Sequence, residues 1–210
     1  MPSSTFLNLD KKKQELFLKI SMQEFTARDF NSASVSEIVR VMNIAKGSVY
    51  QYFNDKIDLY FYLIDLAFSE KLKYLEVESA KVDKSFPAWL KTRQELIASF
   101  DKKKSIYSKL LRSFYLQKNN PLLRKKYLEL KKTELQMMMQ QMDKYSDVLR
   151  KNIDKAQLAA LLLELPQVIE DYPEVKEGKK LTLKSRGAVA STNVTNGYID
   201  ILSKGIVKTK

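Results

Sequence analysis

Residues 46–56 carry side chains whose types and spacing suit contact with a nucleic acid. Lys46 and Gly47 stand side by side, and the phenols of Tyr50 and Tyr52 follow them closely. A lysine donates to guanine O6 and N7, a glycine lets a backbone come close to a groove, and a phenol donates to phosphate oxygens. The alternative is that these residues form a solvent-exposed helix start with an ordinary turn glycine. The elements predicted around them are therefore needed to distinguish a DNA-contacting surface from this alternative.

Helical spacing predicts the elements that would position these side chains. Residues 10–27 place Phe17, Ile20 and Phe25 on one face, as an amphipathic helix does. A short helix is expected over about residues 45–52, and a long helix is expected to begin near Asp55.

A further short helix is predicted between these segments, beginning after Ser34. Residues 34–37 read Ser-Val-Ser-Glu, a capping-box pattern in which the Ser34 hydroxyl accepts from the Glu37 amide and the Glu37 carboxylate reaches back. Asn43 follows this helix and tolerates the left-handed backbone that a tight corner requires. Two short helices joined by such a corner form a helix-turn-helix unit.

The second helix of such a unit points its N-terminal residues at base edges in the major groove. Val49 and Phe53 lie four residues apart and are assigned to the inward face, which leaves Tyr50 and Tyr52 facing outward. Lys56 is expected in the first turn of the next helix, where its ammonium and the free amides would attract a phosphate. The candidate DNA-contacting residues are Ser34, Ser36, Arg40, Lys46, Gly47, Ser48, Tyr50, Gln51, Tyr52 and Lys56.

Composition restricts the classes of function that remain. The 210 residues include no cysteine and no histidine, so thiol and imidazole catalysis and the usual zinc sites are excluded. No motif places a catalytic residue, a metal ligand or a cofactor, and we predict a protein that is not an enzyme. Neither a signal peptide nor an apolar run of about 20 residues is found, which favours a cytoplasmic location.

The net charge of +12 favours an anionic partner. Its distribution does not point to the helix-turn-helix, because residues 1–60 hold eight basic and seven acidic side chains. The prediction of DNA binding therefore rests on the pattern of residues. The near-neutral segment leaves open an alternative function, a helical interaction or peripheral membrane-associated module without sequence-specific DNA binding.

Helices are also predicted for most of the remaining chain, which has only 5 Gly and 5 Pro. The expected ranges are about 86–100, 103–117, 122–144, a helix capped by Asp154, and 191–207, with an exposed loop over 173–190. The fold class is therefore all-α.

The residues 17–59 resemble the DNA-binding domain of the TetR family of transcriptional regulators. The resemblance is carried by the block Ile-Ala-Lys-Gly-Ser-Val-Tyr-Gln-Tyr-Phe at residues 44–53 and by Lys56 and Leu59, which follow the family's Y-x-x-F-x-x-K-x-x-L spacing. Ala45 stands where a serine often caps the recognition helix, which weakens that helix start by about 1 kcal/mol.

The resemblance implies an N-terminal three-helix DNA-binding domain over residues 1–54 and a larger helical effector-binding and dimerisation domain over residues 55–210. It further implies a ligand-responsive repressor that binds a pseudo-palindromic operator as a homodimer, with the last two helices pairing between subunits.

Aromatic and methionine side chains in the C-terminal region are the candidates for effector contacts. Methionine adapts to varied apolar shapes. The candidates are Tyr107, Phe114, Tyr127, Met138 and Met142. At helical spacing such residues belong to a core more often than to a pocket, so the two interpretations stay open.

Overall fold

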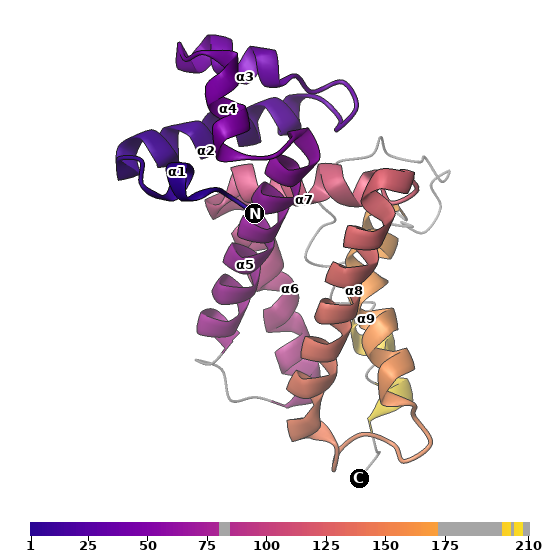
Figure 1. The fold of residues 1–210 in the computed structure, drawn as a ribbon. Coiled ribbons are helices and arrows are strands. Elements are labelled where there is room, and N and C mark those ends of the chain that lie inside the picture. Colours follow the sequence, from indigo (N-terminus) through magenta and orange to yellow (C-terminus); the bar gives the residue numbers. More distant parts are fainter. Residues whose placement is uncertain (80–84, 172–198, 203, 208–210) are drawn as a thin grey trace, which may run out of the picture. The chain divides into compact units, whose positions relative to one another are not determined.

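The computed structural model describes residues 1–79, 85–171, 199–202 and 204–207, and these are almost entirely helical (Figure 1). The helices are α1 (Ser4–Leu7), α2 (Lys11–Ala27), α3 (Val35–Met42), α4 (Lys46–Tyr52), α5 (Lys56–Ser79), α6 (Phe86–Lys103), α7 (Ser105–Leu116), α8 (Pro121–Met142) and α9 (Lys155–Asp171), with a 3-10 turn at Asp143–Tyr145. No β-strand occurs among the described residues, where Leu149 and Val207 form one isolated bridge. The all-α prediction is confirmed.

The chain divides into two compact units. The first unit comprises Met1–Glu76 and Ala98–Leu128, and the second comprises Val77–Ile97 and Glu129–Lys210. Because α5, α6 and α8 each cross this division, the units do not coincide with the predicted domains 1–54 and 55–210. The assignment of DNA binding to residues 1–54 and of effector binding and dimerisation to residues 55–210 stays a prediction.

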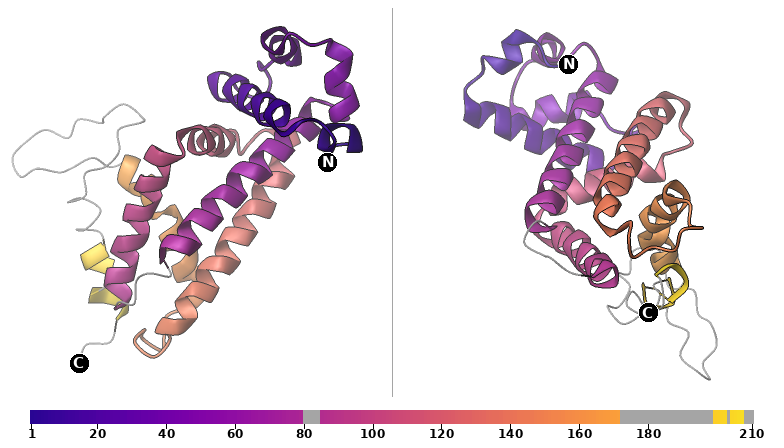
Figure 2. Two further views of the ribbon diagram at one scale, coloured as in Figure 1. Left: turned by 90° about the vertical axis from the view of Figure 1, so that its left-hand side faces the viewer. Right: turned by 90° about the horizontal axis from the view of Figure 1, so that it is seen from below.

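The first unit packs α2, α3 and α4 around the N-terminal turns of α5 (Figures 1 and 2). Aromatic rings fill its centre: Phe25 of α2 lies 4.7 Å from Tyr60 of α5, and Phe17 stacks on Phe53 at 6.0 Å. Such ring pairs stabilise a core beyond the area they bury. The same unit includes α7, which packs against α2.

The N-terminal helix α1 is an element that helical spacing did not predict. The Ser3 side chain caps it by accepting from the Phe6 amide at 3.3 Å. Phe6 is fully buried against Phe17, Tyr52 and Phe53. The Ser3 amide donates to the Tyr52 carbonyl at 2.9 Å, so α1 is fastened to the C-terminal end of α4.

The boundaries of α2 and α9 confirm two predicted helix starts. Asp10 caps α2 by accepting from the amides of Lys12 and Lys13 at 3.0 and 3.4 Å. Asp154 precedes α9 and accepts from the Gln157 amide at 2.7 Å. Both satisfy amides that would otherwise lack partners at a helix N-terminus.

The second unit has its own apolar core, in which side chains of α8 and α9 meet those of α6. Phe86 and Trp89 of α6 lie with Met138 and Met142 of α8 and Leu162 of α9. The predicted loop over residues 173–190 lies outside the described residues. Of the predicted last helix, residues 199–202 and 204–206 are described and helical. No helix in the described part of the chain is long and apolar enough to cross a membrane.

Candidate nucleic-acid interface

The corner between α3 and α4 is formed by the C-cap residue of α3, whose backbone angles are left-handed. Asn43 has φ 52° and ψ 47°, and it is the non-glycine residue with positive φ among those described. The Asn43 amide donates to the Arg40 carbonyl and the Ile44 amide donates to the Val39 carbonyl, at 3.3 and 3.1 Å. These bonds satisfy the last carbonyls of α3 and turn the chain into α4. The prediction for Asn43 is confirmed.

The recognition-helix candidate α4 presents one face to its core and another to solvent. Val49 and the adjoining Phe53 are both buried, as predicted. Lys46, Gly47 and Gln51 are exposed, and Tyr50 exposes 50% of its surface. A lysine, a glycine, a phenol and an amide therefore share an open surface on a short helix.

Gly47 is not required by the fold. A Cβ atom built at this position would meet no atom within 4 Å, and its backbone is helical. Glycine in a helix costs about 0.5–1 kcal/mol relative to alanine. The fold thus carries a small loss of stability at a position where a bare backbone faces outward.

The start of α4 lacks a capping side chain, as the sequence predicts. Ala45 occupies the N-cap with extended backbone angles and makes no side-chain cap hydrogen bond. The Ser48 amide instead donates to the Ala45 carbonyl at 3.0 Å. Ser48 itself is half-buried.

The expectation that Tyr52 faces outward is wrong. Its ring lies 5.7 Å from the ring of Phe6 and 5.7 Å from that of Phe17, and the residue is half-buried. The ring is held inward because α1, which was not predicted, covers this end of α4. A phosphate contact by the Tyr52 hydroxyl stays a prediction.

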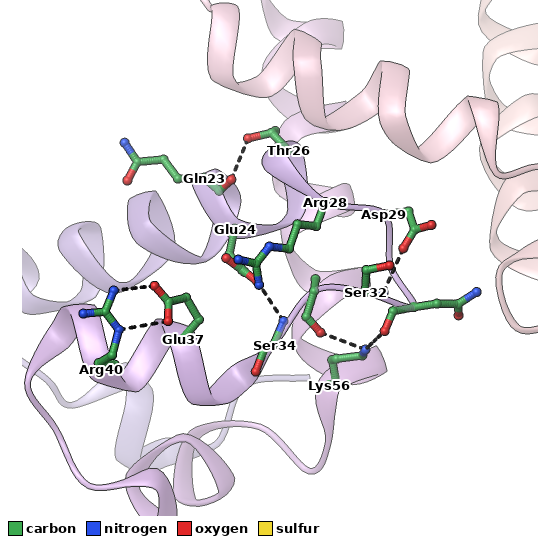
Figure 3. A network of polar contacts seen from close by, with 12 residues as sticks. Gln23, Glu24, Thr26, Arg28, Asp29, Ser32, Ser34, Glu37, Arg40 and Lys56 are labelled. Carbon is green, nitrogen blue, oxygen red and sulfur yellow. Dashed lines mark hydrogen bonds and ion pairs between the residues drawn. The ribbon is translucent and has the colours of Figure 1, made fainter.

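The predicted capping box at Ser34 is also wrong. Ser34 is the N-cap of α3 but makes no side-chain cap hydrogen bond. Glu24, buried on α2, accepts from the Ser34 amide at 2.9 Å and from Arg28 Nη1 at 3.2 Å (Figure 3). A carboxylate from another helix thereby anchors the chain where it enters α3. Glu24 was missed because only the fold brings it to Ser34.

The Glu37 carboxylate pairs with Arg40 instead of returning to Ser34 (Figure 3). Arg40 Nε and Nη2 donate to it at 2.9 and 2.5 Å. The hydrogen bond from Arg40 lowers the pKa of Glu37, and the same bond raises the pKa of Arg40. Arg40 and Ser36 are both exposed on α3, with Arg40 in its last turn near the corner and Ser36 in its first turn.

Lys56 occupies a different environment from the one expected. Its Nζ donates to the carbonyls of Asn31 and Ala33 at 3.1 and 3.0 Å and lies 4.7 Å from the centre of the Phe30 ring (Figure 3). Two of its three donors therefore hold the segment that leads into α3. A phosphate contact by Lys56 stays a prediction, but its position gives it a structural role that spacing alone did not reveal.

The candidate effector residues are divided between the two units. Tyr107, Phe114 and Tyr127 belong to the first unit, and Met138 and Met142 belong to the second. Phe114, Met138 and Met142 are buried in apolar cores, as the alternative interpretation has it. Tyr127 packs edge-on against Tyr115 at 6.1 Å. Their contact with an effector stays a prediction.

Two short helices joined by a tight corner, with the second helix open to solvent, have the architecture of a helix-turn-helix, whose second helix enters the major groove in DNA-binding proteins. Residues 12–63 match the family model described as bacterial regulatory proteins, tetR family. Residues 12–63 are therefore a DNA-binding domain of the TetR kind, and the chain is similar to the transcriptional regulators of that family.

Solved structures of the same fold cover 95% or more of the chain. A TetR-family regulator from Chloroflexus aurantiacus is 20% identical with a TM-score of 0.66, and all of both chains is covered. One from Cytophaga hutchinsonii is 15% identical with a TM-score of 0.68, over 97% of this chain and 100% of that chain. A regulator from Saccharomonospora viridis in complex with choline is 15% identical with a TM-score of 0.62, over 95% and 100%. No curated protein matches the sequence.

Proposed function

We propose that the chain is a homodimeric, ligand-responsive repressor that binds a pseudo-palindromic operator through α4. The observation that carries this proposal is the open face of α4, where Lys46, Gly47, Tyr50 and Gln51 are exposed while Val49 is buried. Residues 1–54 are proposed as the DNA-binding domain and residues 55–210 as the effector-binding and dimerisation domain.

In this proposal the first turn of α4 enters the major groove. Lys46 donates to guanine O6 or N7, and Gln51 contacts a base or a phosphate. Gly47 allows the backbone to approach the base edges, and the Tyr50 phenol donates to a phosphate oxygen. Ser34, Ser36, Arg40, Ser48 and Tyr52 are proposed to contact DNA around this centre, and Lys56 is proposed to contribute by holding the segment that leads into α3.

Dimerisation would place two copies of α4 in successive major grooves, about 34 Å apart. Exposed apolar side chains near the C-terminal end support a subunit interface there. Leu161 of α9 exposes 48% of its surface, and Ile201 exposes 71%. We propose that a second subunit covers these side chains.

Regulation requires an effector that binds one arrangement of the two α4 helices more tightly than the other. The similar regulator that was solved in complex with choline supports a small-molecule site in the C-terminal region of this chain. The effector of this chain is not thereby identified. We place the protein in the cytoplasm, as a regulator and not an enzyme.

Selection of genomic DNA fragments by the purified protein tests the proposal, followed by a gel shift with the fragments retained. Lys46→Ala is expected to weaken binding by at least about tenfold, the value of one base contact. Lys132→Ala removes the same charge from an exposed position on α8 and serves as the matched control.

Gly47→Ala gives a sharper test because its two effects have opposite signs. Since the added Cβ meets no atom of the fold, the free energy of unfolding should rise by about 0.5–1 kcal/mol. DNA affinity should fall, because the methyl group occupies the space that the bases need. Unchanged binding in both Lys46→Ala and Gly47→Ala would refute the role of α4, and a peripheral interaction module would then explain the chain better.

A further inference from the structure

Gln117 joins the C-terminal end of α7 to the segment between α2 and α3. Its Oε1 accepts from the Phe30 amide at 2.9 Å, across 87 positions of sequence, and its Nε2 donates to the Ser113 carbonyl at 3.0 Å. The side-chain orientation follows from these partners, since a reversed amide would set donor against donor and acceptor against acceptor. Both groups belong to the first compact unit.

The segment that Gln117 holds determines where α3 begins. Within it, the Ala33 amide donates to the Asp29 carbonyl at 2.9 Å, and Asp29 Oδ1 accepts from the Ser32 amide at 2.8 Å. Lys56 fastens the same segment to α5, as described above. A shift of residues 29–33 therefore displaces the start of α3 and, through the Asn43 corner, α4. Gln117 is the contact that brings α7 into this arrangement.

A second buried polar group lies beside Gln117. Tyr60 is fully buried, with its ring 5.1 Å from Phe30 and 6.2 Å from Phe114. Its hydroxyl has no hydrogen-bond partner in the part of the chain that is described. Burial raises the pKa of the Tyr60 phenol, and the nearby Gln117 amide partly offsets this. An unpaired buried hydroxyl is costly, so an arrangement that pairs it would recover part of that cost.

We propose that Gln117 is a positioning residue that transmits displacement of α7 to the helix-turn-helix, with the Tyr60 hydroxyl as its alternative partner. In the arrangement described here, Gln117 Oε1 holds the Phe30 amide. A shift of the end of α7 towards α5 lets the Tyr60 hydroxyl donate to Gln117 Oε1 and loosens the bond to Phe30. The inference rests on the proposed function, because it assigns a regulatory role to groups behind the DNA-binding surface.

Transmission of this kind is reciprocal. If displacement of α7 alters DNA affinity, then DNA binding must alter the state of α7 by the same coupling free energy. DNA alone therefore serves as the probe, in the absence of an identified effector. A purely structural role for Gln117 would not make the end of α7 respond to DNA.

Hydrogen exchange of the free full-length protein is the first measurement. Gln117→Ala is expected to speed exchange of the Phe30 amide by about tenfold or more, because that amide loses its acceptor. Gln136→Ala, at an exposed position on α8, should leave it unchanged. Equal exchange of the Phe30 amide in the wild type and in Gln117→Ala would overturn the proposal.

The second measurement compares exchange of residues 111–118 with and without the DNA fragment that the wild type selects. The wild type should show a change of at least about threefold on binding DNA. Gln117→Ala and Tyr60→Phe should both lose this response, while Tyr60→Phe keeps the protection of the Phe30 amide in the free protein. Tyr62→Phe, a half-buried tyrosine on the same helix, is the matched control.

The possible failures are distinct. A wild-type protein that selects no DNA refutes the proposed function, whereas the exchange of the Phe30 amide is measured without DNA. A wild-type protein that binds DNA without any response at residues 111–118 refutes the transmission through Gln117. A response that persists in Tyr60→Phe refutes the part of the proposal that assigns the hydroxyl as alternative partner.

Discussion

Lys56 distinguishes two roles that a lysine can have beside a DNA-binding helix. Lys56→Met keeps an unbranched side chain of similar length and removes only the ammonium, which donates to two carbonyls and lies over the Phe30 ring. Each bond is worth about 1 kcal/mol at this half-buried position, and the ring contact adds about 0.5–1 kcal/mol. We expect the free energy of unfolding to fall by about 2–3 kcal/mol.

Thermal unfolding measures this loss, which corresponds to a decrease in Tm of roughly 4–12 °C for a chain of this size. The salt dependence of DNA affinity measures the other role. Each phosphate contact contributes about 0.9 to the slope of log K against log salt concentration. If two copies of Lys56 contacted phosphate in a dimer, Lys56→Met would reduce that slope by about 1.8.

We expect an unchanged salt slope together with a lowered Tm, since the Lys56 ammonium is engaged by the protein itself. Lys132→Met, at an exposed position on α8, removes the same charge and should alter neither quantity appreciably. A slope reduced by about 1.8 with an unaltered Tm would refute the reasoning. It would show that the ammonium leaves its carbonyl partners to bind DNA.

Three further predictions concern the helix-turn-helix and the segment that leads into it. Asn43→Ala should destabilise the protein by about 1–2 kcal/mol in urea, because Asn43 has φ 52°, whereas Asn43→Gly should cost little. Ala45→Ser should raise the Tm, since a hydroxyl at this extended N-cap contributes about 1 kcal/mol. Hydrogen bonds from Ser32, from its side chain foremost, lower the pKa of Asp29 in the folded protein below the ordinary value of 3.8. The ionised Asp29 carboxylate therefore stabilises the fold fully at a pH above 3.8, and this stabilisation is lost as the pH falls through the lowered pKa. The difference in urea midpoint between the wild type and Asp29→Ala should therefore be larger at about pH 7 than at about pH 2.

Local patterns predicted the helix-turn-helix well because its determinants lie close together in sequence. The left-handed corner depends on Asn43 itself, and the missing cap depends on Ala45 itself. The inward positions Val49 and Phe53 follow from a separation of four residues, which aligns them on one face. Each of these predictions needed only a few neighbouring residues.

The failures at Ser34 and Tyr52 share a physical cause. In each case a group distant in sequence supplies the partner: Glu24 takes the Ser34 amide, and Phe6 covers the Tyr52 ring. Spacing shows that Lys56 stands at a helix start, but a carbonyl and a phosphate oxygen attract an ammonium alike. A regular pattern therefore identifies the position of a side chain without identifying the group it contacts.

The attachment of α1 to α4 has a consequence for the order of folding. The Ser3 hydroxyl donates to the Gln51 carbonyl at 2.5 Å across 48 positions, so this contact closes a long loop. Because closing a long loop costs more entropy than forming a local turn, we expect this contact to form after the turn at Asn43 has joined α3 to α4. Interactions absent from the transition state act mainly on the rate of unfolding. Phe6 is then a residue that sets how long the folded recognition helix persists, more than how quickly it forms.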